Sequence, residues 1–552
     1  MRITLKNKLL KIYLVILICL STQYASSQNY NRYWVQFTDK VQNQILLQTP
    51  EKVLSARSLA RRLKNNATFD ETDLPVSSNY LDSLTKHGAK IIYTSRWFNS
   101  ATIELQIDSI KSNIEKLTCV QKIEKTFDEP HLKSGKFSDK LKIEFTENLS
   151  LYNSTYYNNS FDQINLENGI PLHNSGYRGN GIQIALLDGG FLNADKYLSL
   201  KNIFSEGRVL GTHDFVNPGN DVYNTETHGA EVFSIIGANL SNSFVGTAPD
   251  ASFWLLRSEY SPTEYPVEED NWVAAAEYAD SVGADIISSS LGYTEFDNPA
   301  YDHNYSDMNG KTSRASIAAE IAVSKGIVTI ISAGNEGNKS WHYISSPADA
   351  NGVLAIGATD NLGDKTNFSS FGPSSDGRIK PDVSAMGSQV YVETNIGEYN
   401  KGNGTSFSAP IIAGLTACLI QAFPSAKAID IMNAVRESSN SYSSPNNSLG
   451  YGIPNFSVAT SILAAISPAN QSKIEIFPNP FRNYFVINVG ETDSTNVTLQ
   501  IFNISGQSVL SSLIKNSNFV YLSSEIESLS QGIYFIKVNI NGHSTVLKAI
   551  KL

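Results

Sequence analysis

The segment Ile184-Ala185-Leu186-Leu187-Asp188-Gly189-Gly190 is a short apolar run that ends in a carboxylate and two glycines. Comparable apolar runs follow at 251–256, 285–290, 327–332 and 353–356, and helical patterns lie between them at 272–282 and 313–325. Buried strands that alternate with helices are typical of a parallel sheet covered by helices on both faces. We therefore predict an α/β domain with a mostly parallel sheet over residues 166–463.

Four polar residues of this domain stand where a strand would end or an apolar helix would begin. They are Asp188, His228, Asn335 and Ser406. Active groups of an open parallel sheet gather at the carboxyl ends of its strands. Ser406 opens an apolar helix, where free backbone N–H groups and the helix dipole favour developing negative charge. Taken singly, each residue also has an ordinary explanation: a turn Asp or Asn, a core His, or a Ser N-cap.

The chain order Asp188, His228, Ser406 is the subtilisin-type order of a catalytic triad. With it, residues 165–463 resemble the subtilases, the subtilisin-like serine endopeptidases. The motifs that carry the resemblance are Gly404-Thr405-Ser406-Phe407-Ser408-Ala409-Pro410, His228-Gly229, Ala333-Gly334-Asn335, Ser290-Leu291-Gly292, Gly246-Thr247-Ala248-Pro249 and Lys380-Pro381-Asp382-Val383.

The resemblance implies a role for each of these residues. Ser406 would attack the peptide carbonyl, His228 would move the proton, and Asp188 would orient His228. Asn335 and the Ser406 backbone N–H would form the oxyanion hole. The substrate backbone would pair with two strands, formed by Ser290, Leu291 and Gly292 and by Ser332, Ala333 and Gly334. Three departures from the family pattern bear on specificity: Gly189 after the Asp, Ala230 after His-Gly, and Phe407 after the nucleophile.

The N-terminal third is predicted to hold segments that the mature enzyme lacks. Residues 1–27 have a basic start, an apolar run and small residues before Gln28, as in a secretory signal peptide. Residues 28–133 alternate strand and helix patterns as a small α+β unit, with Arg57, Arg61, Arg62 and Lys64 on an amphipathic helix over 53–63. This unit resembles a subtilase propeptide, which would act as folding chaperone and inhibitor. Residues 134–165 are predicted to be a linker and maturation region.

The C-terminal part changes to period-two alternation. After a linker at 464–472, residues 473–552 are predicted to form a β-sandwich, with a hairpin turn at Asn541-Gly542. Its motifs resemble the type A sorting domain of the type IX secretion system of Bacteroidota. These motifs are 476–481, 501–506, Leu529 with Gly532 and Tyr534, and 548–552. The less favoured interpretation is a generic adhesion module.

Composition limits the remaining choices. The 552 residues carry a net charge of −10 and only 3 Cys, which argues against nucleic-acid binding, a disulfide scaffold and a zinc module. We expect an exported chain, secreted or held at the cell surface, with no transmembrane segment after the signal. Its partners would be protein or peptide substrates, its own propeptide as an intramolecular inhibitor, and the secretion machinery. The chemistry needs no cofactor.

The loop 293–312, with Asp297, Asp302, Asp307 and Asn309, is predicted to be a solvated acidic loop, and a structural calcium ion is the alternative.

The leading hypothesis is a secreted serine endopeptidase made as a self-processing zymogen. A catalytically silent surface protein that uses the same fold for binding is the runner-up, but binding alone would not require the whole Asp, His, Ser and Asn set. A lipase or esterase of the α/β-hydrolase type would need Gly-x-Ser-x-Gly and a triad with His last. Ser406 is followed by Ser408 instead of Gly, and His228 precedes it.

Overall fold

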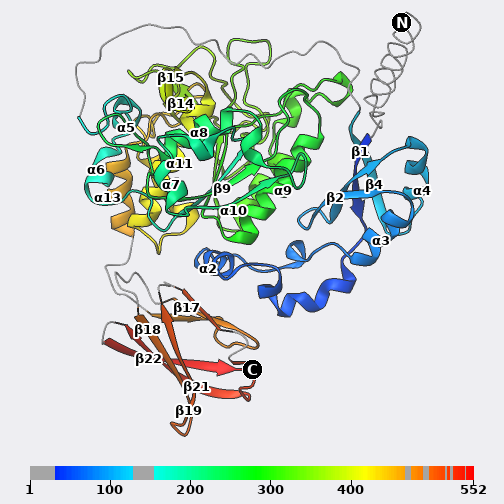
Figure 1. Cartoon of the computed structure of the whole chain (residues 1–552), viewed down its shortest axis with the longest axis vertical. Helices are drawn as coiled ribbons and strands as arrows, with labels where there is room; N and C mark the ends of the chain where they lie inside the picture. Colours follow the sequence, from blue (N-terminus) through cyan, green and yellow to red (C-terminus); the bar gives the residue numbers. More distant parts are fainter. Residues whose placement is uncertain are drawn as a thin grey trace, which may run out of the picture.

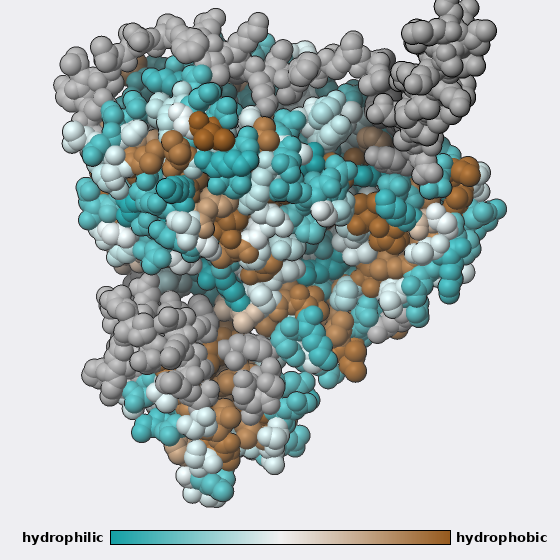
Figure 2. Space-filling model, in the orientation of Figure 1, coloured by the Kyte–Doolittle hydropathy of each residue, from teal (hydrophilic) through white to brown (hydrophobic). Residues whose placement is uncertain are grey.

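The structure is a computed structural model that describes residues 31–128, 155–466, 474–488, 496–515, 519–522, 526–540 and 543–552. Three bodies with their own sheets follow one another along the chain (Figure 1). The predicted signal peptide, the turn Asn541-Gly542 and most of the predicted maturation linker lie outside the described residues. The face seen in Figure 2 is mostly hydrophilic, with apolar residues in small separate groups.

The N-terminal body is a four-stranded antiparallel sheet in the order β2-β3-β1-β4. Its strands are β1 (Asn31–Phe37), β2 (Lys90–Ser95), β3 (Ser100–Leu105) and β4 (Val120–Phe127). Helices α3 (Ser78–Lys86) and α4 (Lys111–Ile114) supply Leu84 and Ile114 to the same core as Val35 and Ile103. Helix α2 spans Ala56–Lys64 and begins three residues later than predicted, because the Ser55 hydroxyl accepts a bond from the Ser58 N–H and caps the helix there.

The central body is a seven-stranded sheet in the order β13-β12-β11-β10-β5-β9-β6, and every recorded strand pair is parallel. The five predicted strands correspond to β5 (Gln183–Asp188), β9 (Ser252–Arg257), β10 (Ile286–Ser289), β11 (Val328–Ser332) and β12 (Leu354–Thr359). The sequence patterns missed β6 (Val209–Asp214) and β13 (Val383–Met386), which form the two outer strands.

Helices cover both faces of this sheet, as predicted. One face packs against α9 (Val267–Val282) and α10 (Arg314–Ser324), which confirm the two predicted helices. The other face packs against α8 (His228–Gly237) and α11 (Thr405–Ala422). The body is completed by α5 (Asp162–Asn165), α6 (Ile170–Asn174), α7 (Lys201–Ser205), α12 (Ala428–Glu437), α13 (Phe456–Ile466), and the hairpins β7 (Asn239–Leu240) with β8 (Phe244–Val245) and β14 (Val390–Asn395) with β15 (Glu398–Gly402).

Helix α11 is the central helix of the domain. It is long and apolar enough to cross a membrane by length and composition, but 89% of it is buried inside the protein. Cys418 lies in this helix and is buried, and burial raises the pKa of its thiol, as expected for a packing residue.

One expectation about the linker is corrected. Tyr157 and Ile164 lie in the stretch 134–165, yet both are buried in the core of the central body. Isolated apolar residues among polar ones give no periodic pattern, so the sequence did not show this packing.

The C-terminal body has two antiparallel sheets, as predicted for a β-sandwich. One sheet orders β16 (Glu475–Phe477), β17 (Phe485–Asn488) and β20 (Phe519–Leu522). The other orders β19 (Ser508–Lys515), β18 (Asn496–Asn503), β21 (Gly532–Ile540) and β22 (His543–Lys551). Phe485, Leu499 and Ile536 meet in a shared core.

Candidate active site

The structure brings Asp188 and His228 together. Asp188 is the last residue of β5, and His228 is the first residue of α8. The Asp188 carboxylate is buried, and its Oδ1 lies 2.8 Å from His228 Nδ1. The same oxygen accepts a bond from the Gly189 N–H at 2.8 Å. This arrangement fixes the imidazole ring and favours a proton on Nδ1, the tautomer that a general base acting through Nε2 needs.

Gly229 allows α8 to start this close to the sheet. A Cβ at this position would lie 2.4 Å from the Gly190 carbonyl oxygen and 2.9 Å from Asp188 Cβ. Such contacts are too short for any side chain. The His-Gly pair of the sequence motif therefore has a steric reason.

Ser406 lies in the first turn of α11, on the same face of the sheet as α8. Its hydroxyl donates a long bond of 3.4 Å to the Ser290 carbonyl, and the Ser290 hydroxyl donates to the Ser406 carbonyl at 2.9 Å. The neighbouring Phe407 is buried, and its ring centroid lies 6.0 Å from that of His228. The departure from the family pattern at Phe407 thus places an aromatic ring beside the His228 imidazole.

Two N–H donors converge beside Ser406. The Asn335 Oδ1 accepts the Thr405 N–H at 2.9 Å and the Thr405 hydroxyl at 3.0 Å. These two bonds engage the amide oxygen with Thr405 and leave the amide nitrogen out of the contact with Thr405. The point that a Cβ on Gly404 would occupy lies 3.6 Å from Asn335 Nδ2 and 3.7 Å from the Ser406 nitrogen. Gly404 has φ +151°, a conformation that side-chain-bearing residues rarely adopt. A glycine here keeps the space next to both nitrogens free of a side chain.

Thr405 is a residue of this site that the sequence analysis missed. Its buried hydroxyl accepts the Gly334 N–H at 3.2 Å while it donates to Asn335. It therefore links the segment after β11 to the amide orientation of Asn335. Its position directly before Ser406, within the motif Gly404 to Pro410, could have indicated that it belongs to the site.

The two segments predicted as substrate-pairing strands need correction. Strand β10 ends at Ser289 and β11 ends at Ser332, so Ser290, Leu291, Gly292, Ala333 and Gly334 lie beyond the strands. The Ala333 carbonyl accepts the Ser345 N–H at 3.3 Å, and the Gly334 carbonyl accepts the Ser370 N–H at 3.0 Å. The carbonyl groups of Ala333 and Gly334, in the second segment, are thus already bonded to other parts of the catalytic domain.

The first segment is different. Among the residues that the structure describes, the backbones of Leu291 and Gly292 have no recorded partner. The Ser345 hydroxyl lies between the two segments, 2.2 Å from where a Cβ on Gly292 would be and 3.1 Å from where one on Gly334 would be. Of the two segments, the first is thus the one in which backbone N–H and C=O groups, those of Leu291 and Gly292, are left without a partner within the described part of the chain.

Comparison with known proteins agrees with this geometry. A model described as the subtilase family matches residues 179–452. Subtilisin DY of Bacillus licheniformis is 29% identical over 278 residues, which cover 48% of this chain and 88% of that protein. Thermitase of Thermoactinomyces vulgaris is 30% identical over 246 residues, which cover 44% of this chain and 75% of that protein. The chain belongs to the subtilase family. It is a subtilisin-like serine protease.

The flanking bodies of this subtilase also match known domains. Residues 32–141 match the peptidase S8 propeptide domain of Bacteroidota, and residues 475–552 match a secretion system C-terminal sorting domain. The sorting domain indicates export. A solved protease structure from Pseudoalteromonas arctica PAMC 21717 has 21% identity and a TM-score of 0.44, covering 56% of this chain and 100% of that chain.

The acidic loop 293–312 of the subtilase uses several of its oxygen ligands internally. Asp302 Oδ1 accepts the Phe296 N–H at 2.7 Å, and Asp307 Oδ2 accepts the Asn304 N–H at 2.7 Å. Asn309 Oδ1 accepts the Lys311 N–H at 2.7 Å. Within the described ranges, no group of three or more His, Cys, Asp or Glu side chains is placed to hold a metal ion. Structural calcium in this subtilase stays a prediction.

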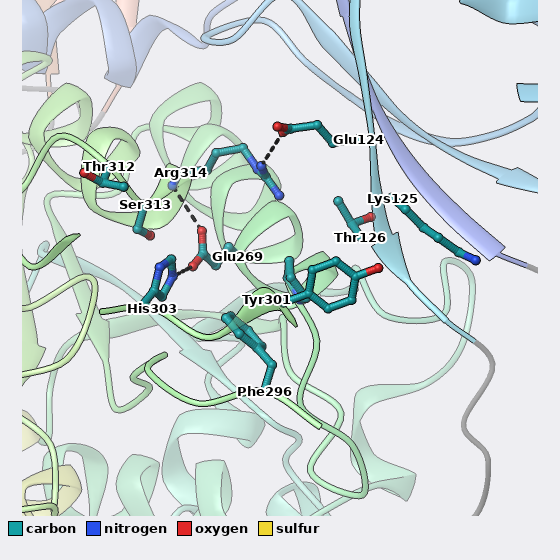
Figure 3. A pocket seen from close by; sticks show the side chains of 11 residues that line it. Glu124, Lys125, Thr126, Glu269, Phe296, Tyr301, His303, Thr312, Ser313 and Arg314 are labelled. Carbon is teal, nitrogen blue, oxygen red and sulfur yellow. Dashed lines mark hydrogen bonds and ion pairs between the residues drawn. The ribbon is translucent and has the colours of Figure 1, made fainter. Parts of the chain in front are cut away.

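A cavity of about 380 Å³ lies between β4 of the propeptide and the catalytic domain (Figure 3). His303 Nε2 lies 2.5 Å from Glu269 Oε1, and Arg314 Nη1 lies 3.2 Å from Glu124 Oε2 on β4. Burial lowers the pKa of His303, but the bond to Glu269 and the negative charges of Glu269, Asp307 and Asp349 together outweigh it and raise the pKa overall. No triad candidate lines this cavity. It belongs to the junction between the propeptide domain and the protease domain.

Proposed function

We propose that this subtilase hydrolyses peptide bonds of proteins through Asp188, His228 and Ser406, with an acyl-enzyme intermediate. The observation that carries the proposal is the 2.8 Å contact of Asp188 with His228 beside the helix turn that holds Ser406. The Ser406 hydroxyl would exchange its long bond to the Ser290 carbonyl for one to His228 Nε2. His228 would take the proton as Ser406 attacks and deliver it to the leaving amine, while Asp188 stabilises the imidazolium.

The negative charge of the tetrahedral intermediate would be held by two groups. The Asn335 amide nitrogen and the Ser406 nitrogen border one space that Gly404 leaves without a side chain, and the first turn of α11 adds its dipole. Substrate backbone would add along Leu291 and Gly292, whose N–H and C=O groups have no partner among the described residues. Ser290 would position Ser406 through their mutual bonds rather than bind substrate directly.

We also propose that the enzyme is made as a self-processing zymogen. The propeptide domain would inhibit the protease until the segment between residues 128 and 155 is cut, and the C-terminal domain would engage the secretion machinery. An N-terminal signal peptide would start export. The product would be secreted or held at the cell surface.

Mass spectrometry of the secreted products tests both proposals. The wild type is expected to lose residues 28 to about 140 by its own action, and Ser406→Ala is expected to keep them and to leave casein intact. Ser408→Ala is the matched control, because Ser408 is buried in the same turn and its hydroxyl has no partner among the described residues. If the wild type and Ser406→Ala mature identically, another protease does the processing and casein hydrolysis decides on activity. If the wild type does not hydrolyse casein, the proposed activity is wrong.

A further inference from the structure

Residues 38–77 of the propeptide domain leave its small sheet between β1 and α3, and we call them the propeptide arm. The arm contains α2, which carries Arg57, Arg61 and Arg62. Figure 1 shows α2 beneath the catalytic domain, well apart from α3 and α4, which pack on the propeptide sheet. The arm therefore extends the contact of the propeptide along the catalytic domain, beyond the sheet that α3 and α4 cover.

The arm contacts the turns that precede three neighbouring strands, β5, β10 and β11. Arg57 donates to the carbonyls of Gly181 and Gly283, at 2.8 and 3.1 Å. Arg61 donates to the carbonyls of Ala284 and Lys325, at 2.7 and 3.4 Å. Since the strands are parallel, these turns lie together at the amino edge of the sheet. The carboxyl edge, where Asp188 lies, is about 17 Å away along β5.

Three guanidinium groups of the propeptide enclose one carboxylate of the protease. Asp280, near the end of α9, accepts bonds from Arg61, from Arg62 at 2.5 Å and from Arg96 at 2.6 Å. The Asp280 side chain is 0% exposed. Two further carboxylates stand beside it: Glu277 accepts the N–H groups of Arg96 and Trp97, and Asp285 pairs with Arg57. We call Glu277, Asp280 and Asp285 the anionic socket.

The arm also offers carboxylates to the protease. Lys325, at the end of α10, donates to Asp73 at 3.0 Å and to Asp70 at 3.2 Å. Arg62 binds the same Asp73 in bidentate fashion, at 2.7 and 2.8 Å. The charges on the two sides are thus opposite in sign and closely paired, and most of them are buried, which is the condition under which buried ions are tolerated.

We propose that the anionic socket is a second propeptide-binding surface, which recognises the arginine side chains of α2 together with Arg96 and holds the propeptide on the protease after the chain between them has been cut. None of these contacts involves Asp188, His228, Ser406 or Asn335. Cutting between residues 128 and 155 leaves every one of them intact, so the arm keeps the cleaved propeptide in place whatever occupies the active site. The socket is exposed only when α2 leaves, and an arginine-bearing helix is the ligand that it fits.

The test measures release of the cleaved propeptide from the full chain. A recognition site for a sequence-specific protease is placed between residues 128 and 155 of the Ser406→Ala protein, the chain is cut there, and loss of the propeptide piece is followed by size-exclusion chromatography after dilution. Arg61→Met removes a buried partner of Asp280, and release is expected to become about 100-fold faster. Arg57→Gln changes a rim residue whose side chain is 36% exposed, and an effect of about threefold to tenfold is expected.

Arg178→Gln is the matched control. Arg178 pairs with Asp250 at 2.8 Å on the protease itself, outside the arm contacts, and its loss should leave the release rate within about twofold of that before substitution. The proposal is overturned if Arg61→Met and Arg57→Gln both release the propeptide at the unsubstituted rate. If Arg61→Met does not fold, Arg57→Gln decides alone. The inference rests on the proposed inhibitory role of the propeptide, and the two can fail separately. If the cleaved propeptide stays bound to the enzyme with an intact Ser406 but does not inhibit it, the inhibitory role is refuted, whereas binding of the arm to the anionic socket is not.

Discussion

The two edges of the seven-stranded sheet use polar groups in opposite ways. At the carboxyl edge, the amide nitrogens of Asn335 and Ser406 border one space without a side chain, and the backbone of Leu291 and Gly292 has no partner among the described residues. At the amino edge, guanidinium groups cover the strand-preceding carbonyls and enclose Asp280. An edge that binds substrate transiently must keep its donors oriented but uncommitted, whereas an edge that retains a partner is stable only when its charges are paired.

The substitution expected to change the difference between the two edges most is Asp280→Asn, at the amino edge. The substitution leaves buried guanidinium groups without their shared carboxylate, and the free energy that holds the propeptide in the zymogen should fall by about 3–5 kcal/mol. The measurement is urea denaturation of the Ser406→Ala full chain, followed by tryptophan fluorescence, because Trp34 and Trp97 of the propeptide domain are buried against the catalytic domain, beside Arg314 and in its apolar core.

Asp250→Asn makes the same chemical change at a partly exposed pair and should cost less than about 1 kcal/mol. If Asp280→Asn costs no more than this control, the amino edge does not depend on its charges and the comparison fails.

The next effect belongs to the carboxyl edge. Asn335→Ala removes one of the two donors aimed at the developing oxyanion, and kcat on a peptide substrate should fall by about 10²–10³. KM should change little, because the bond forms fully only in the transition state. An unchanged kcat would place the oxyanion elsewhere. Asn361→Ala, at an exposed position on the same domain, is the control.

A smaller effect separates an orienting group from a contacting one. Thr405→Val keeps the side-chain shape but removes the hydroxyl that bonds Gly334 and Asn335, so Asn335 retains only the Thr405 N–H. The loss of one such bond should lower kcat by about tenfold with KM nearly constant. Thr416→Val is the matched control, since Thr416 is buried in the same helix and its hydroxyl has no partner among the described residues. Equal losses in both variants would mean that α11 had been disturbed as a whole.

The two edges also differ in how far the sequence reveals them. Asp188, His228 and Ser406 each stand at the end of a strand or in the first turn of a helix, so their neighbourhood in the chain already places them at the carboxyl edge. The amphipathic helix with Arg57, Arg61 and Arg62 was also visible. Its partner Asp280 lies far along the chain inside α9, and no local pattern joins two such segments.

The errors have the same origin. The sequence shows that Ser332-Ala333-Gly334 follows a buried strand, but only the tertiary structure shows that Ser345 and Ser370 use its carbonyls. Strand β13 has only four residues and β6 contains Gly, His and Asp, so neither carries a clear strand pattern. Local sequence patterns therefore predict helices and strands and where they end, whereas contacts between segments distant in the chain can be seen only in the tertiary structure.

The smallest expected effect is that of mild acid on the amino edge. Burial raises the pKa of Asp280, but Arg62, Arg61 and Arg96 outweigh it and hold the pKa below its usual range. Burial likewise opposes ionisation of Asp73, and Arg62 and Lys325 lower its pKa overall. A lowered pKa in the complex contributes binding above the usual carboxyl pKa of about 3.9, and this contribution is lost only as pH falls through the lowered value.

Glu277 has the opposite sign, because burial raises its pKa and its contribution therefore declines as pH rises through the raised value. Release of the cut propeptide should accordingly change by less than about threefold between pH 7 and pH 5, and should accelerate only below about pH 4. Glu277→Gln should remove whatever acceleration is seen toward pH 7. Rapid release already at pH 5 would mean that Asp280 and Asp73 are not held ionised by the guanidinium and ammonium groups around them, and the amino edge would then resemble an ordinary exposed salt-bridge surface.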